Sequence, residues 1–383
     1  MRVTGALGAL IFNASLIALP FSAAETWRAW NNGEIYTYAV TPQSIAATRG
    51  ALDHAAAALT ANASDRNTAW AELVAQELNE GDFRAAHGLL LASPAMLAPA
   101  EANKLQTRLP AFATDDQITT AALTLLPPDF AQGFQRPGAG DFLVVGDTRD
   151  LAIDAERWLQ GQSVDELTLI LSGIAAASPP DFKKDAEGGA SVVKLTMRTG
   201  QLTEPLSAYL SNLTFAAAPP EQVKEAIETA LASAQAGTEG NAVTEAFRAS
   251  INPTEFQRLA LVLADIRAVG AGAGADSAAR LLTLARNGAD LKRLRLIATS
   301  GGDRAALLFK RSDKDRLLDL ARGNWAFSAH AMQALGAFAL SLLGLLFSTL
   351  FGLRQMRLRR EEQDLMPPPD PILASSALVE EKR

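Results

Sequence analysis

The feature that most constrains this chain is an uncharged run of 29 residues, from Trp325 to Leu353, near its C-terminal end. As an α-helix this run would be about 43 Å long, whereas the hydrocarbon core of a bilayer is about 30 Å thick. Apolar residues occur all round the helix, which is unlike the one-sided pattern of a helix on a soluble core. We therefore expect a C-terminal transmembrane helix over residues 325–353, with a buried core helix as the alternative.

A second apolar run opens the chain. Residues 1–24 carry one charge, Arg2, before an uncharged stretch, with Ser22 and Ala24 at the −3 and −1 positions of a cleavage site. This is the layout of a secretory signal peptide. An uncleaved anchor is the alternative, because the uncharged stretch is long enough to span a bilayer.

Either form of the N-terminal segment sends residues 25–324 across the membrane. We expect a bacterial inner-membrane protein with a periplasmic main domain and a cytoplasmic, disordered tail at residues 354–383. Four arginines follow the apolar run at once, as is typical of a cytoplasmic flank. They are Arg354, Arg357, Arg359 and Arg360.

Charge is unevenly distributed along the exported region. Residues 25–279 have a net charge of −14, whereas residues 280–322 have a net charge of +6. The basic segment predicts attraction to anionic lipid headgroups, or else ordinary solvated helix faces. The acidic remainder argues against a nucleic-acid partner.

Helical patterns extend through most of the exported region, and strand signals are scarce. The sequence predicts an all-α protein, either an irregular helical bundle or a short α-solenoid. Its parts are an N-terminal helical region at 25–125, a linker rich in proline and glycine at 126–146, and a second helical region at 147–324.

Several local signals place individual helices. Asn252-Pro253-Thr254-Glu255 and Pro219-Pro220 are helix starts, and Ser163-Val-Asp-Glu166 has the spacing of a capping box. The apolar run 167–178 is predicted to be a buried helix, with a membrane-dipping element as the alternative. The glycines at 270, 272 and 274 predict a flexible turn.

Two resemblances follow from short motifs. Residues 70–94, with Trp70, Gly81-Asp82-Phe83 and Ala86, resemble a single tetratricopeptide unit. The runs 145–151, 280–295 and 302–304 look like a group of uncharacterised bacterial membrane-anchored envelope proteins. That resemblance implies a membrane anchor and carries no assigned activity.

Residues that could support catalysis are few. The chain has no cysteine, and its three histidines are far apart, so neither a thiolate nor a histidine metal centre is expected. Asp147 and Asp150 could act as an acid–base pair, but at a helix start they more commonly cap the helix. We expect no cofactor, and we leave enzymatic activity as an open alternative. His54 and His87 are predicted to be surface or core histidines.

The predicted membrane helix carries a stripe of small residues on one face. Such a stripe allows another helix to approach closely. We therefore expect a protein partner or a homodimer to pack there, in addition to the bilayer itself. The packing face consists of Ala337, Ser341, Gly344, Ser348 and Gly352.

These observations predict a membrane-anchored, exported helical scaffold or accessory protein that acts through protein–protein contacts in the bacterial envelope. One alternative is an accessory subunit of an envelope transporter or channel, with residues 167–178 at the membrane. Another is a cell-wall hydrolase with Asp147 or Asp150 at its centre. The sequence does not identify a small-molecule ligand.

Overall fold

The computed structural model describes residues 2–31, 36–93, 96–109, 148–235 and 237–364. Regular structure within these ranges is α-helical apart from two short strands, which confirms the expected all-α class. The chain divides into two compact units. The two-helix unit is Met1–Ile35 with Phe327–Arg383, and the core unit is Tyr36–Ala326.

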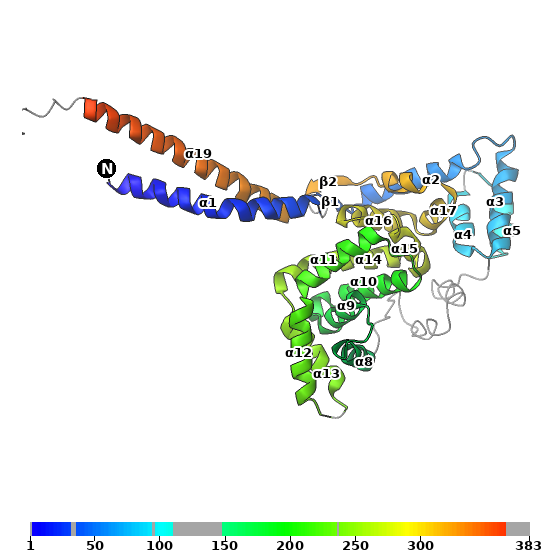
Figure 1. The fold of residues 1–383 in the computed structure, drawn as a ribbon. Helices are drawn as coiled ribbons and strands as arrows, with labels where there is room; N and C mark the ends of the chain where they lie inside the picture. The colour runs from blue at the N-terminus through cyan, green and yellow to red at the C-terminus, as the bar shows by residue number, and fades with distance from the viewer. Residues whose placement is uncertain (1, 32–35, 94–95, 110–147, 236, 365–383) are drawn as a thin grey trace, which may run out of the picture. The chain divides into compact units, whose positions relative to one another are not determined.

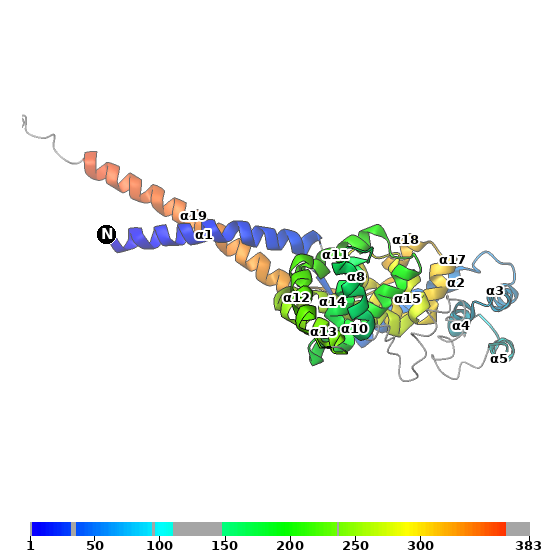
Figure 2. The same ribbon diagram turned by 60° about the horizontal axis from the view of Figure 1, so that its bottom comes forward.

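The two-helix unit is a pair of long helices. α1 spans Arg2–Asn31 and α19 spans Ala329–Asp364. The two helices lie side by side and run in opposite directions (Figures 1 and 2). α1 continues without a break past Ala24, the residue at which the sequence predicts cleavage.

The core unit begins and ends in a two-stranded sheet. Strand β1 (Tyr36–Ala39) pairs with strand β2 (Asn324–Phe327), so the first and last segments of the unit are neighbours. Between them lie α2 (Pro42–Ala58), α3 (Arg66–Glu80), α4 (Phe83–Ala92), α5 (Pro99–Gln106), α8 (Thr148–Leu159), α9 (Glu166–Ala177), α10 (Pro180–Arg198), α11 (Glu204–Ala217), α12 (Pro220–Ser233), α13 (Glu239–Ser250), α14 (Pro253–Ala273), α15 (Ala275–Leu282), α16 (Gly288–Gly301), α17 (Asp303–Arg311), α18 (Lys314–Leu317) and the 3₁₀ turn η3 (Leu318–Leu320).

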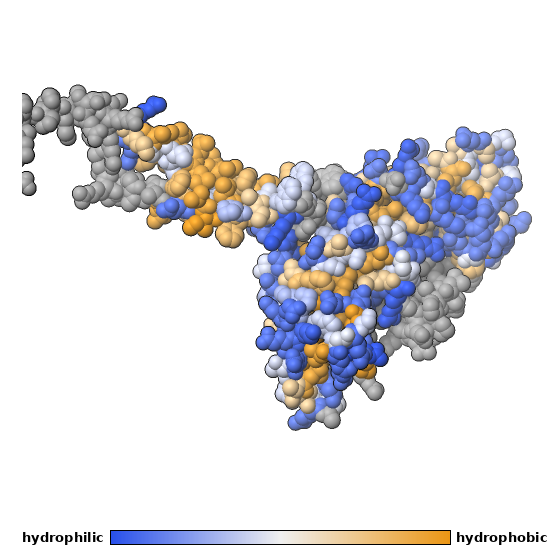
Figure 3. All heavy atoms as spheres, in the orientation of Figure 1, coloured by the Kyte–Doolittle hydropathy of each residue, from blue (hydrophilic) through white to orange (hydrophobic). Residues whose placement is uncertain are grey.

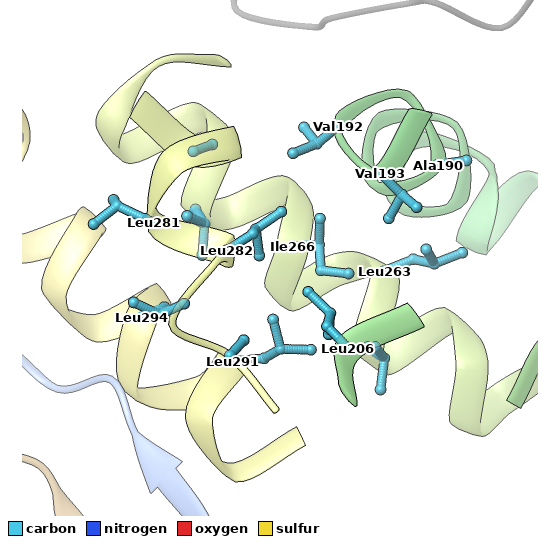
Figure 4. Packing of buried hydrophobic residues seen from close by; sticks show 14 of the residues in the cluster. Ala190, Val192, Val193, Leu206, Leu263, Ile266, Leu281, Leu282, Leu291 and Leu294 are labelled. Atoms are coloured by element: carbon cyan, nitrogen blue, oxygen red, sulfur yellow. The ribbon is translucent and has the colours of Figure 1, made fainter. Parts of the chain in front are cut away.

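α14 is the central helix of the core unit. It packs against α10, α11, α15 and α16. Its Leu263 and Ile266 are fully buried among leucines and valines from these neighbours (Figure 4). The sequence signal for this helix is confirmed, because Asn252 caps its N-terminus by accepting from the backbone N–H groups of Thr254 and Glu255.

Glycines allow α14 to approach its neighbours closely. A Cβ on Gly189 of α10 would lie 2.3 Å from the carbonyl oxygen of Leu263, and one on Gly272 would lie 2.7 Å from the backbone of Ala298 in α16. Gly270 and Gly272 are therefore packing positions inside α14, and the turn predicted across 270–274 is wrong. The helix ends at Gly274, where φ is +82°.

The apolar run 167–178 forms the buried helix α9. It contacts α8, α10, α11 and α13, and most of its side chains are buried, including Leu171 and Ile174. The helix begins at Glu166 with Asp165 as its N-cap, so the capping box predicted at Ser163 is wrong. Because its apolar side chains face the protein core, α9 offers little apolar surface to a bilayer.

Helices from both predicted helical regions belong to the same unit. α2 packs against α16, and α4 packs against α17. Where the sequence resembles a single tetratricopeptide unit, the chain forms the two helices α3 and α4, with Gly81 in the left-handed conformation between them. The linker predicted at 126–146 lies outside the described residues. The tail predicted to be disordered over 354–383 is helical as far as Asp364, where α19 ends, so that part of the prediction is wrong, and the rest of the tail lies outside the described residues.

Candidate functional site

α19 is the long apolar helix that the sequence predicts near the C-terminal end, although residues 325–327 of the predicted span 325–353 lie in β2 and the helix continues to Asp364. In the part of the chain that the structure describes, one segment, Met332–Leu358, is long and apolar enough to cross a membrane. Its large side chains are exposed, including Leu343, Phe347 and Leu350. Figure 3 shows apolar side chains gathered along this helix pair. Such a surface is suited to lipid, because contact with apolar lipid chains is more favourable for these side chains than contact with water.

The predicted small-residue face of α19 lies largely against α1. Ser341 and Ser348 are buried, Gly344 and Gly352 are half-buried, and Ala337 is exposed. Ala334, one turn before Ala337 on the same stripe, is also buried. The buried residues of α19 are thus seven positions apart.

α1 presents the matching pattern. From Leu10 onward, where the burial of α1 is described, its buried positions are Ser15, Ser22 and Ala29, again seven residues apart. A Cβ on Gly344 would lie 2.1 Å from the Oγ of Ser15, so Ser15 fits where Gly344 has no side chain. Small residues that recur every seven positions keep the same face of each helix against its partner over several turns.

The hydroxyl groups on this face are satisfied within their own helices. Ser341 donates to the carbonyl oxygen of Ala337 and Ser348 donates to that of Gly344, both at 2.8 Å. Ser22 donates to the carbonyl oxygen of Ala18 at 3.0 Å. These bonds remove the cost of an unpaired hydroxyl in an apolar environment.

Of the two predicted acid–base candidates, Asp150 alone is among the described residues. Asp147 lies outside them, and Asp150 is exposed at the start of α8. Asp150 and Asp154 act electrostatically on Lys194 of α10, which is buried. Burial, with a smaller contribution from Arg198, lowers the pKa of Lys194 to about 8 against the opposing effect of the two aspartates. No group of three or more potential metal ligands occurs among the residues described.

A buried ionic cluster, missed in the sequence, joins α4 to α17. Asp303 accepts from Arg84 Nη1 at 3.0 Å, and its other oxygen lies 2.7 Å from His87 Nδ1. Arg84 and Asp303 are both buried. His87 is therefore held by a carboxylate rather than being a plain surface residue. Nothing local in the sequence identifies this cluster, because Asp303 is more than 200 residues away from both Arg84 and His87.

A second ionic cluster lies between α3 and α17. Glu77 is fully buried, and its two oxygens accept from Lys310 Nζ and Arg311 Nε, each at 2.6 Å. Arg304 also pairs with Asp53 of α2, and Arg295 pairs with Asp265 of α14. Much of the basic segment 280–322 is thus used inside the core unit, which explains the opposite charges of the two sequence regions.

The core unit has an open groove between α12 and α13. Its volume is about 1020 Å³. Short side chains form most of its lining, with polar residues among them. Ala226 and Ala230 of α12 line one side, and Asn241, Glu245 and Ala249 of α13 line the other. The groove is open to solvent, and it was not identified from the sequence.

Comparison of the chain with protein-family models, with curated proteins and with solved structures found no match.

Proposed function

We propose that this protein is a membrane-anchored helical scaffold or accessory protein that acts through protein–protein contacts in the bacterial envelope. The observation that carries the proposal is the contrast between the two units. The core unit buries its apolar side chains in a continuous core of its own, whereas α19 exposes large apolar side chains along Met332–Leu358. Such a chain combines a folded helical unit with a tether in the bilayer.

The proposed orientation places the core unit in the periplasm and the C-terminal tail in the cytoplasm. Arg354 and Arg357 lie at the C-terminal end of the apolar segment Met332–Leu358, with two further arginines at residues 359 and 360. Basic residues close to the end of a membrane helix favour the cytoplasmic side. The apolar N-terminal helix supports export of the residues that follow it.

The groove between α12 and α13 is the contact surface that we assign to this role. Its alanines leave space between the two helices, and its polar side chains can hydrogen-bond to a partner. Protein contact surfaces commonly combine such a recess with a polar rim.

Cross-linking of the full-length protein in cells, followed by purification in detergent, tests the proposal. We expect a protein partner to be cross-linked to the wild type, and Ala249→Arg to reduce its recovery at least about tenfold, because the larger charged side chain enters the groove. Ala232→Arg is the matched control, since Ala232 is exposed on α12 and does not line the groove. Equal recovery with both variants would contradict the role of the groove, and the absence of any cross-linked protein would contradict the scaffold.

A further inference from the structure

We infer that α1 is retained in the mature protein as a second membrane span, and that α1 of the same chain occupies the small-residue face of α19. This inference rests on the proposed function in one respect, namely that α19 crosses the bilayer. It differs from the expectation of a cleaved signal peptide, and it assigns the helix that packs on Ser341, Gly344 and Ser348.

The first observation is that α1 is continuous through the predicted cleavage position. The helix extends from Arg2 to Asn31, and Thr26 donates to the carbonyl oxygen of Ser22 at 2.8 Å, across the bond between Ala24 and Glu25. Ser22, at the −3 position, is buried. Proteases cut extended, accessible chain more readily than a packed helix, so this segment is a poor substrate as long as the pair is formed.

The second observation is that both helices have the same repeat. Ser15, Ser22 and Ala29 of α1, and Ala334, Ser341 and Ser348 of α19, are all buried. Large apolar side chains on the other faces of α1 point outward, and Leu10, Ile17 and Phe21 are at least 65% exposed. Each helix therefore has one small face toward the other and an apolar surface that lipid can cover.

The third observation is that the register of the two helices brings their basic residues to one end of the pair and the tryptophans of α1 to the other end. Ser15 lies against Gly344, and the helices are antiparallel. Counting thirteen residues from this contact toward the start of α1 and toward the end of α19 places Arg2 level with Arg357. Counting twelve residues the other way along both helices places Trp27 level with Met332. At 1.5 Å per residue, the distance between the two levels is about 38 Å.

This length fits a bilayer with its interfaces. The hydrocarbon core is about 30 Å thick, and basic and aromatic residues are enriched at its two edges. Trp27 and Trp30 are 66% and 65% exposed at the end of α1 that leads to the core unit. The opposite level carries Arg2 and the arginines that follow residue 353. Two spans with both termini on the cytoplasmic side satisfy all of these positions.

The first experiment is intact-mass and N-terminal analysis of the full-length protein purified from membranes in detergent. We expect residues 2–24 to be present. A mature N-terminus at Glu25 would overturn the inference. If that shortened protein were still in the membrane fraction, the anchoring role of α19 would stand, whereas its loss from the membrane would contradict the proposed function as well.

The second experiment uses the absence of cysteine from the chain. Ser15→Cys with Gly344→Cys is expected to form a disulfide on mild oxidation, because the Ser15 Cβ lies 3.2 Å from a Cβ built on Gly344, close to the usual separation of about 3.5–4.5 Å. Leu16→Cys with Gly344→Cys is the matched control, since Leu16 is 52% exposed. We expect at least about fivefold less disulfide in the control.

The species formed distinguishes the two possible partners. A monomer protected from maleimide labelling until it is reduced supports pairing within one chain. A covalent dimer formed by the Ser15→Cys, Gly344→Cys variant would show pairing between chains and would overturn this assignment, as would equal disulfide formation in the control.

Discussion

At the scale of single residues, contacts across helix pairs depend on positions without a side chain. Gly173 of α9 faces the ring of Phe247, which is fully buried in α13. A Cβ on Gly173 would lie 2.2–2.3 Å from three ring carbons. The ring cannot move into solvent, so the two helices would have to separate.

We predict that Gly173→Ala destabilises the core unit by about 1–3 kcal/mol through overpacking. Gly50→Ala is the control, because Gly50 lies in α2 with no atom within 4 Å of the added Cβ, and it should stabilise the helix by up to about 1 kcal/mol. The urea midpoint of the helical signal by circular dichroism measures both. A neutral Gly173→Ala would contradict the close packing of α9 on α13.

Because the pKa of Lys194 is lowered by burial, we expect the free energy of unfolding to depend on pH. Burial lowers its pKa from 10.5 to about 8 in the folded protein. Between these values the unfolded chain binds more protons than the folded chain, so the free energy of unfolding rises as the pH is raised from 8 to 10.5. The penalty of holding the buried charge is present in full below pH 8 and corresponds to about 3 kcal/mol at most.

Lys194→Met is therefore expected to stabilise the protein at pH 7 by about 1–3 kcal/mol, and to remove this part of the pH dependence. Unfolding midpoints of both proteins at pH 7 and pH 9.5 test the expectation. A less stable variant at pH 7 would show that the contacts of the ammonium group outweigh its burial.

At the scale of elements, ion pairs attach the N-terminal helices to α17. Glu77 of α3 is fully buried between Lys310 and Arg311. Removal of Glu77 deprives Arg311 of its buried partner but leaves Lys310 paired with Glu80 at 2.6 Å, so the cost should be about 1–3 kcal/mol, below that of a fully uncompensated buried charge.

We predict a loss of this size for Glu77→Ala. Glu72→Ala, on the exposed side of the same helix, should change the free energy of unfolding by no more than about 0.5 kcal/mol. Urea unfolding of the two variants gives the comparison, and equal effects would contradict a structural role for the cluster.

The sequence predicted those elements whose signals are local. Asn252 before Pro253 marks the start of α14, and Pro220 marks the start of α12. One prediction failed because two nearby residues can both act as a helix N-cap, and Asp165 does so instead of Ser163. Another failed because Gly272 resembles a helix breaker but is a close-packing position inside α14.

The candidate sites are formed by contacts between distant parts of the chain. The sequence could therefore predict at most one of the two contacting elements. The small-residue face of α19 follows from its spacing, but the helix that covers it starts more than 300 residues earlier. The cluster of Arg84, His87 and Asp303 likewise has no local pattern. Periodicity describes one face of an element and does not identify its partner.

At the scale of the whole molecule, β1 and β2 bring the two ends of the core unit together. The chain therefore enters and leaves this unit at neighbouring strands, next in sequence to α1 and α19. This connection places a folded unit of nearly 300 residues between α1 and α19 without a long spacer.

The central claim is that α19 crosses the membrane with the core unit on its periplasmic side. Because the chain has no cysteine, single cysteines at Ala232, exposed in the core unit, and at Met356, exposed near the end of α19, can be labelled without background. In intact spheroplasts, a membrane-impermeant maleimide should label Ala232→Cys, and it should label Met356→Cys only after lysis. Labelling of Met356→Cys alone in intact spheroplasts, or of both variants equally, would contradict the account.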